Sequence, residues 1–523
     1  MIQITEKNLT LNGGCAFADF ELDAYAQLDV EVFLESDAVL ELALGEVAQE
    51  DRVNRSPGGY RIIRTMQKAC PAGKSSFAFD LPKHKSPYPY TLSVDLPPEA
   101  GKREITPFRY VEIVGGKGTA KLIRRAFYGD IDESAADFTC DNSCLNRIWN
   151  FCKYTMKATS AFGLYIDGER ERQPYEGDAL SNMLGDLCCG GSPETARRTI
   201  EWLLNNPTWF TEWQLIIPML VWEYRLYSGD LTSVEAWLPE LEKLIQTFAV
   251  QENDLLRDAT AAECKTSRCR RDLIDWPATE RDNYVPGEFN LTPNCYFYQT
   301  LLIMYKLTGN IDYKIQAGRV QKAIERNFRK NNLWVDSIGS DHTALHSVLY
   351  PAYFKVTTAD EEMKTLLCSK GMACSVFTAQ FLLEYCFDNH LADHAFELLL
   401  SDDLRSWRNM LAKGATITME AWDDSLKPNQ DWNHAWGAAP ANLIPRCIAG
   451  IKPLEPGFRK FSVTPHPGKL KEFYCKHPTP AGAIELEYKN NSFKLKVPQG
   501  LTAVTRCGEL RCGTHTLEIM DEI

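Results

Sequence analysis

Two segments of the sequence bring together side chains that could perform acid–base chemistry. The first runs from Tyr165 to Ala179 and holds five carboxylates and two arginines between two predicted helices. A charge run alone is typical of a solvated loop, but apolar residues precede this one, and Pro174, Tyr175 and Gly177 lie within it. In a partly buried loop, arginines hold some carboxylates ionised while another, in a less polar setting, keeps its proton. A general acid needs that arrangement.

The second segment covers residues 416 to 424 and 430 to 436. Glu420 lies there between apolar residues, and its aromatic and basic neighbours are Trp422, Trp432, His434 and Trp436. Aromatic rings stack on the apolar face of a pyranose while polar groups bind its hydroxyls, so this composition is typical of a sugar site. The alternative is a tryptophan-rich core in which Glu420 is a structural hydrogen-bond acceptor.

Glu171 from the first segment and Glu420 from the second form a candidate pair for glycoside hydrolysis. That reaction needs one protonated carboxyl group to assist the leaving oxygen and one ionised group to activate water or attack the sugar. The two residues lie far apart in the chain, so the fold must bring them to one place.

We predict a multidomain fold with a central all-α (α/α)6 barrel between two β-domains. Residues 1 to 137 alternate apolar and polar side chains in short runs separated by turns, which predicts an N-terminal antiparallel β-sandwich. Residues 456 to 523 return to strand patterns and predict a small C-terminal β-domain that packs on the barrel.

Residues 138 to 455 show the period of amphipathic helices. About a dozen helices joined by alternating short and long connections indicate helical hairpins closed into a barrel. The predicted helices span 143 to 159, 176 to 189, 193 to 205, 211 to 228, 231 to 249, 292 to 308, 311 to 329, 341 to 354, 359 to 370, 374 to 389, 391 to 412 and 434 to 449.

The composition of the chain limits the classes of molecule that it is expected to bind. The chain has 523 residues and a net charge of -13, with short basic clusters only, which argues against nucleic-acid binding. Its apolar runs are shorter than the ~20 residues of a membrane span, its first residues do not read as a secretory signal, and its cysteines are scattered. We therefore expect a cytoplasmic protein with a neutral or cationic partner and no membrane partner.

No cofactor or metal is predicted. The sequence has no GxxxxGK[ST], GxGxxG or GxSxG motif, so nucleotide, dinucleotide and α/β-hydrolase chemistry lack their usual signals. The histidine and cysteine pairs lack the spacing or the glutamate of known zinc motifs, and we interpret them as packing or solvated residues. These pairs are His342 with His346, His390 with His394, Cys140 with Cys144, and Cys264 with Cys269.

At these segments the chain resembles the family 78 glycoside hydrolases, the bacterial α-L-rhamnosidases with a six-hairpin catalytic domain. The loop from Asp167 to Ala179 is similar to that family's D-C-P-Q-R-D/E-E/R-x-G-W-x-G-D-A motif. Later family elements are matched by Asp275-Trp276, Met419-Glu420-Ala-Trp422, Trp432-Asn433-His434-Ala-Trp-Gly437 and Ala449-Gly-Ile-Lys-Pro453. The order of β-domain, helical barrel and β-domain also fits.

The resemblance implies an inverting α-L-rhamnosidase with Glu171 as general acid and Glu420 as general base, acting on small rhamnosides. The residues expected to bind substrate are Asp167, Arg170, Tyr175, Asp178, Asp275, Trp276, Trp422, Trp432 and His434. The loop is one residue shorter between Asp167 and Arg170 than the family form, and Pro174 and Tyr175 replace Gly and Trp. These departures put the role of Asp167 and the shape of the pocket in question.

Two alternatives stay open: another six-hairpin glycoside hydrolase, such as an unsaturated uronyl hydrolase or a fucosidase, and a sugar-binding relative without catalysis. The sequence also leaves open the leaving group, the linkage and the oligomeric state, a homodimer included. We expect the long connections 254 to 272 and 280 to 291 to build the side of the site that receives the leaving group.

Overall fold

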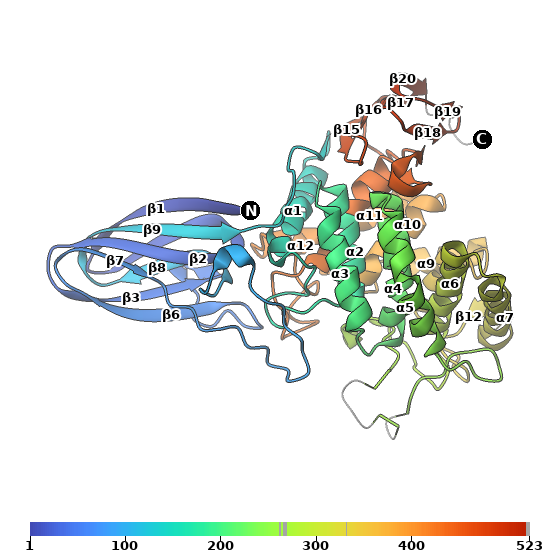
Figure 1. The fold of residues 1–523 in the computed structure, drawn as a ribbon, viewed down its shortest axis with the longest axis horizontal. Helices are drawn as coiled ribbons and strands as arrows, with labels where there is room; N and C mark the ends of the chain where they lie inside the picture. The colour runs from blue at the N-terminus through green and yellow to red at the C-terminus, as the bar shows by residue number, and fades with distance from the viewer. Residues whose placement is uncertain (261–262, 265–268, 331, 519–523) are drawn as a thin grey trace.

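The computed structural model describes residues 1 to 260, 263 to 264, 269 to 330 and 332 to 518. Figure 1 shows three regions along the chain: an antiparallel sheet at the N-terminus, a central group of helices, and strands at the C-terminus. The predicted fold class is confirmed.

The N-terminal sheet is folded into two layers by one long strand, β2 (Cys15–Leu34). The first half of β2 pairs with β8 (Thr106–Val114), and its second half pairs with β9 (Lys117–Phe127) and β7 (Gly73–Ala78). A register shift between Asp19 and Ala24 marks the bend, as a bulge does in other sheets. The sheet is completed by β1 (Ile2–Asn12), β3 (Ala38–Gly45) and β6 (Ile63–Cys70), and β4 (Ala48–Gln49) and β5 (Arg52–Val53) form a small hairpin beside it.

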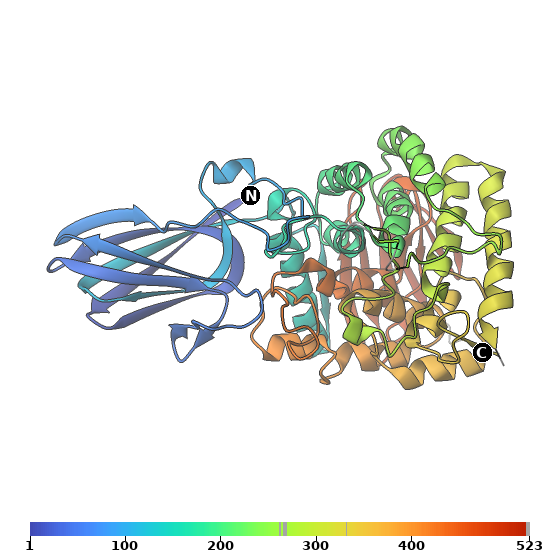
Figure 2. The same ribbon diagram turned by 90° about the horizontal axis from the view of Figure 1, so that it is seen from below.

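The central helices form an inner and an outer layer, which follow from their sequences. Every residue of α2 is buried, and α4, α6 and α10 are apolar on nearly all sides, as inner helices must be. The outer helices, such as α3 and α7, bury one stripe only. Figure 2 shows the helices following one another around the domain. They are α1 (Ser143–Thr159), α2 (Glu176–Cys188), α3 (Pro193–Asn205), α4 (Thr211–Ser228), α5 (Leu231–Gln246), α6 (Leu291–Thr308), α7 (Ile311–Phe328), α8 (Leu345–Tyr353), α9 (Glu361–Lys370), α10 (Val376–Asp388), α11 (Ala392–Leu400), α12 (Trp407–Ala412) and α13 (Pro440–Leu443).

Three predicted helices differ from the structure. The predicted helix 391 to 412 is two helices, α11 and α12, because Ser401 binds the backbone of Asp403 and Ser406 caps α12. The predicted helix 434 to 449 is a 3-10 turn, the short α13 and a π-helical turn, with prolines at 440 and 445 interrupting the backbone hydrogen bonds. The predicted helix 341 to 354 begins only at Leu345.

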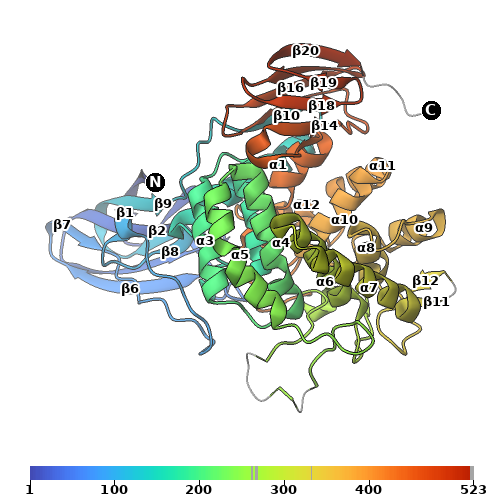
Figure 3. The same ribbon diagram turned by 45° about the vertical axis from the view of Figure 1, so that its right-hand side comes forward.

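The C-terminal region contains two sheets, which lie above the helices in Figure 3. One sheet includes β10 (Asp137–Cys140), which precedes the helices in sequence and pairs with β15 (Glu472–His477). The region is therefore anchored by both ends of the helical domain. The other strands are β13 (Ile451–Pro453), β14 (Lys460–Val463), β16 (Ile484–Lys489), β17 (Ser492–Val497), β18 (Thr502–Thr505), β19 (Gly508–Leu510) and β20 (Gly513–Glu518), and the pair β11 (Arg329–Lys330) and β12 (Leu333–Trp334) lies after α7.

Two further features bear on the sequence predictions. Within the described residues, no helix is both long enough and apolar enough to cross a membrane. Cys264 and Cys269, which we interpreted as packing or solvated residues, form a disulfide, and fifteen other cysteines are free.

Candidate active site

A cavity of about 580 Å³ opens at the N-terminal ends of α2 and α4, and both candidate carboxylates line it. Its walls come from the loop around residues 167 to 178, residues 276 to 279, residues 420 to 436 and the N-terminal domain. The lining residues are Tyr88, Tyr90, Asp167, Arg170, Glu171, Tyr175, Asp178, Trp209, Phe210, Trp213, Trp276, Pro277, Ala278, Thr279, Glu420, Leu426, Lys427, Pro428, Asn429, His434 and Trp436.

The loop that carries Glu171 is closed on itself. The backbone N–H of Asp167 donates to the carbonyl of Gln173 at 3.0 Å, and the N–H of Gln173 donates to Oδ1 of Asp167 at 3.1 Å. At Gly168 a Cβ atom would lie 2.5 Å from Oδ2 of Asp431, so a glycine is needed where the loop passes that side chain. Asp167 thus has a structural role in addition to its place in the cavity wall.

The two arginines of this loop point in opposite directions. Arg172 binds Glu169 through two hydrogen bonds and also donates to Glu104 at 2.7 Å, so it joins the loop to the N-terminal domain. Arg170 faces the cavity and binds Glu420, with Nη1 to Oε2 at 2.6 Å and Nη2 to Oε1 at 2.7 Å. The alternation of charges in the sequence therefore separates a structural ion pair from one in the site.

Glu420 accepts four hydrogen bonds and is buried. Besides the two from Arg170, Nζ of Lys427 lies 3.2 Å from Oε1, and the backbone N–H of Asp431 donates to Oε2 at 3.4 Å. A carboxylate has about four acceptor positions, so all of them are used here. The two longer contacts are the ones that a water molecule could replace.

Glu171 lies in a less polar setting. Nε of Arg170 approaches its Oε1 at 3.4 Å, and the hydroxyl of Tyr175 donates to its Oε2. Burial raises the pKa of Glu171, and the nearby charge of Glu420 acts in the same direction, while Tyr175 and Arg170 lower it only partly. The net increase favours the protonated form that a general acid requires.

His434 bridges two carboxylates and is held as a cation. Its Nε2 lies 2.8 Å from Asp178 and its Nδ1 lies 3.0 Å from Asp431. Burial alone would lower the pKa of His434, but Asp431 and Asp178 outweigh burial and raise it well above its usual value. Both ring nitrogens therefore act as donors.

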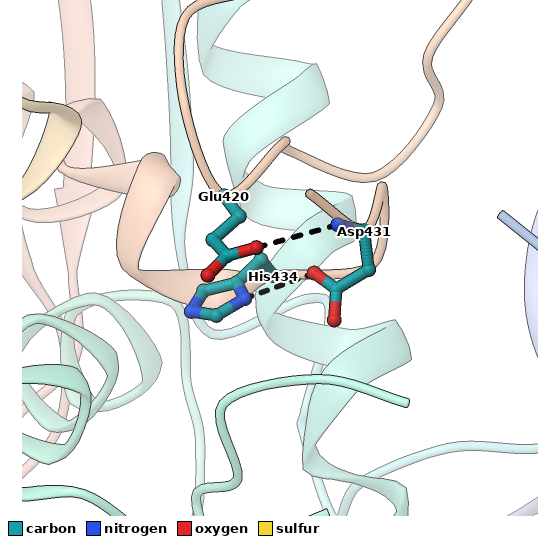
Figure 4. A group of neighbouring side chains, drawn as sticks. All are labelled: Glu420, Asp431 and His434. Atoms are coloured by element: carbon teal, nitrogen blue, oxygen red, sulfur yellow. Dashed lines mark hydrogen bonds and ion pairs between the residues drawn. The ribbon is translucent and has the colours of Figure 1, made fainter. Parts of the chain in front are cut away.

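Glu420, Asp431 and His434 have ligand atoms within 4.8 Å of one another (Figure 4), so we tested whether they fit a metal ion. A metal-bound imidazole must offer a lone pair, whereas both nitrogens of His434 face carboxylates. Glu420 is already paired with two cations. The donor set is that of a hydrogen-bonded ion network, and it does not fit a metal site.

The structure brings most of the predicted site residues together and leaves three outside the cavity lining. Asp167, Arg170, Glu171, Tyr175, Asp178, Trp276, Glu420 and His434 all line it. Asp275 is fully buried instead, bound to His346 at 2.8 Å and to Ser375. Trp422 is buried against Trp407.

The third of these residues is Trp432. Arg61 of the N-terminal domain stacks on its ring, at 4.6 Å from the ring centroid. Asp275, Trp422 and Trp432 therefore support the site from behind or join domains, which sequence spacing alone could not reveal.

Sequence reasoning missed several residues of the site. Asp431 directly orients His434, and Lys427 binds Glu420 and lies 5.5 Å from the ring centroid of Trp276. The contact between Asp431 and His434 could have been predicted, because the two residues are three positions apart in the sequence. Tyr88, Tyr90 and Trp209 gave no signal, because they come from segments with no chemical motif.

Helical hairpins that hold two carboxyl groups in one cavity, one with a raised pKa and one bound by an arginine and a lysine, are the arrangement expected of a glycoside hydrolase of the six-hairpin class. Comparison with known proteins supports the same class. Residues 133–448 match the bacterial alpha-L-rhamnosidase six-hairpin glycosidase domain, and residues 450–505 match the bacterial alpha-L-rhamnosidase C-terminal domain. The chain belongs to this bacterial α-L-rhamnosidase family.

Individual relatives are distant. An alpha-L-rhamnosidase of Formosa agariphila is 21% identical over 442 residues, which cover 75% of this chain and 46% of the relative. The solved rhamnosidase of Aspergillus terreus has a TM-score of 0.77 at 15% identity and covers 98% of this chain and 63% of its own. A Streptomyces avermitilis α-L-rhamnosidase solved with L-rhamnose has a TM-score of 0.73 at 14% identity, covering 98% and 53%. The chain spans about half the length of the curated relatives it matches.

Proposed function

We propose that this chain hydrolyses terminal α-L-rhamnosides with inversion, with Glu171 as the general acid and Glu420 as the general base. The observation that carries the proposal is the shared cavity in which burial raises the pKa of Glu171 while Glu420 is held by two hydrogen bonds from Arg170. The family of the chain supports rhamnose as the sugar.

In the proposed reaction Glu171 transfers its proton to the glycosidic oxygen as the bond to the anomeric carbon breaks. A water molecule, positioned in place of one of the longer contacts of Glu420, loses a proton to that carboxylate and attacks from the opposite face. Glu171 and Glu420 contact different edges of the Arg170 guanidinium, which supports a spacing wide enough for that water. Arg170 and Lys427 hold the Glu420 carboxylate in position before it takes the proton from water.

A neutral sugar fits the charges of the cavity. Among the described lining residues, Arg170 and Lys427 are both paired with Glu420, and His434 lies between Asp178 and Asp431. A uronate would need a cation that is not already committed, so this arrangement favours rhamnose over an unsaturated uronyl substrate. We propose hydroxyl binding by Asp178, His434 and Arg170, with Trp276 and Tyr175 as the apolar wall.

Proton NMR of the hydrolysis of an aryl α-L-rhamnoside tests the proposal, because it reports sugar, activity and anomeric outcome together. We expect β-L-rhamnose as the first product, before mutarotation. A first product with the α configuration would contradict inversion. Cleavage of fucosides or unsaturated uronides alone would instead identify the rival six-hairpin activities, and rhamnose binding with no hydrolysis would identify a sugar-binding protein.

A further inference from the structure

A segment of the N-terminal domain reaches into the active-site cavity. Between β7 and β8 the chain leaves the sheet on the side of the helices (Figure 2), and residues 86 to 94, which we call the strap, run along the Glu171 loop. The Ser93 hydroxyl donates to the carbonyl of Glu171 at 2.7 Å, and the N–H of Val94 donates to the carbonyl of Arg172 at 2.8 Å. The strap is thus hydrogen-bonded to the backbone that carries the proposed acid.

The strap presents two tyrosines side by side. Its sequence Pro87-Tyr88-Pro89-Tyr90 places Pro89 at the second position of a turn, closed by the N–H of Thr91 to the carbonyl of Tyr88. The rings of Tyr88 and Tyr90 stack with centroids 5.5 Å apart and an angle of 14° between their planes. Both rings are partly exposed and line the cavity. Pro89 restricts the backbone of this turn, so the two rings keep their positions without a bound ligand.

The two tyrosines continue an aromatic row that begins at the acid. Tyr175, whose hydroxyl binds Glu171, packs edge-on against Trp209 with centroids 6.0 Å apart. Trp209 packs edge-on against Tyr90 at 5.2 Å. The row therefore leads from Glu171 to the rim of the cavity.

This row lies on the leaving-group side of the proposed reaction. A general acid must stand beside the glycosidic oxygen, so the group attached to that oxygen lies next to Glu171. Lys427, Asn429 and Trp276, by contrast, surround Glu420 or the pocket beside it. We had expected the connections 254 to 272 and 280 to 291 on the leaving-group side, but none of their described residues lines the cavity.

We propose that Tyr88, Tyr90 and Trp209 form a binding site for a planar aromatic leaving group. The wall next to these three residues is completed by Phe210 and Trp213, and none of the five side chains is charged. A sugar in this position could stack one face on the rings, but the hydroxyls of Tyr88 and Tyr90 and the ring N–H of Trp209 are few partners for its several hydroxyl groups. A flat ring gains stacking or edge-to-face contacts there and pays no such desolvation penalty. The inference rests on the proposed function, since it assigns the other half of the same substrate.

The test compares two leaving groups of similar size, one with a planar aromatic ring and one with a saturated ring. Benzyl and cyclohexylmethyl α-L-rhamnosides release primary alcohols of similar size and acidity, so the demand for proton transfer from Glu171 is alike. We expect the wild-type protein to prefer the benzyl substrate in kcat/KM by about tenfold, the effect of one or two aromatic contacts. The double variant Tyr88→Ala/Tyr90→Ala should reduce that ratio to near one.

Matched variants separate ring contacts from folding effects. Tyr88→Phe/Tyr90→Phe keeps both rings and should keep the preference. Leu92→Ala changes an exposed side chain on the same strap, outside the cavity lining, and should leave the ratio unchanged. The inhibition constant of free L-rhamnose should be the same in all of these proteins, because the sugar site is untouched.

The outcomes are distinct. An unchanged benzyl preference in the double alanine variant would overturn the aromatic site while leaving the proposed hydrolysis intact. Weaker inhibition of that variant by free rhamnose would also overturn the aromatic site, because the tyrosines would then bind the sugar itself. An equal loss with a rhamnosyl glucoside would identify a sugar as the leaving group and also overturn the inference. If the wild-type protein hydrolyses no rhamnoside, the proposed function itself fails.

Discussion

The two ends of the inner helices carry the same ion-pair motif but differ in chemistry. At the cavity described above, Glu420 binds Arg170 and Lys427. At the opposite ends of α4, α6 and α10, a cavity of about 490 Å³ contains Glu384, which binds Arg446 at 2.8 Å and Lys452 at 3.3 Å. A buried glutamate with an arginine and a lysine is therefore not sufficient evidence for an active site.

Both cavities hold a second carboxyl group whose pKa is raised by burial, Glu171 in one and Glu223 in the other, so what differs is the set of partners around it. Beside Arg170 stands Glu171, whose pKa is raised by burial and which accepts a hydrogen bond from Tyr175, with an aromatic row leading outward. Burial would raise the pKa of Glu384 as well, but Arg446 and Lys452 outweigh it and lower that pKa to about 2. Only the first cavity adds the Tyr175 hydroxyl on its raised carboxyl group and a histidine, His434, between Asp178 and Asp431. Each experiment below tests one part of the difference between the two cavities.

The largest expected effect is on turnover. Glu171→Gln should lower kcat on benzyl rhamnoside by roughly a thousandfold, because the leaving alcohol then lacks a proton donor. The loss should be much smaller with 4-nitrophenyl rhamnoside, whose leaving group departs without a proton. Glu420→Gln should impair both substrates alike. Equal losses on both substrates with Glu171→Gln would argue against its role as acid.

Glu384→Gln is the matched variant at the other end. It leaves Arg446 buried without its carboxylate partner, while Lys452 keeps Asp388, so we expect roughly 3 to 5 kcal/mol of lost stability in denaturant unfolding, most of it from Arg446. The folded fraction should keep its kcat. A specific loss of turnover in folded Glu384→Gln would break the proposed distinction between the two ends.

The low pKa of Glu384 predicts that the stability of the protein depends on pH. The folded pKa of about 2 lies below the ordinary glutamate value of 4.5, so the contribution of Glu384 is present above pH 4.5 and is lost as the pH falls toward 2. For this buried group the contribution is roughly 3 kcal/mol. Denaturant unfolding of the wild-type protein and Glu384→Gln across that range should give curves that converge at low pH. Curves that stay parallel would show that Glu384 does not contribute in this way.

A smaller effect on kcat is expected when Lys427 or its counterpart in the other cavity region, Lys452, is replaced. Lys427→Met removes one of the longer contacts of Glu420 and leaves the Arg170 pair, so kcat should fall by about tenfold or less. Lys452→Met should not change kcat. Steady-state kinetics of the two folded variants measure this difference. A similar loss in both would indicate an effect on stability alone.

The smallest expected effect is a shift of the pH profile. The acid must be protonated, so turnover falls as the pH rises through the raised pKa of Glu171. The hydroxyl of Tyr175 lowers that pKa, so Tyr175→Phe should move the fall of kcat to higher pH. Tyr385→Phe, in the other cavity, should not move it. A shift to lower pH would contradict the assigned environment of Glu171.

Sequence patterns predicted the order of the β and helical regions, most helices and the loop from Asp167 to Asp178 that lines the cavity, because hydrophobic period and local motif are properties of short segments. They failed where short polar residues or prolines broke a helix, as at Ser401 and Pro445. They also failed to separate residues of one type: Trp276 lines the cavity, whereas Trp422 and Trp432 pack elsewhere.

The sequence by itself therefore determined which residues could act as acid and base, and that a helical domain carries them. Only the tertiary structure decided that Arg170 turns into the cavity while Arg172 turns away, and that Tyr88 and Tyr90 meet the Glu171 loop. The physical reason is that protonation and contact depend on burial and on partners distant in sequence, such as Glu420 and the strap. Periodicity reports which face of an element is buried, and the packing of several elements decides what each buried charge finds there.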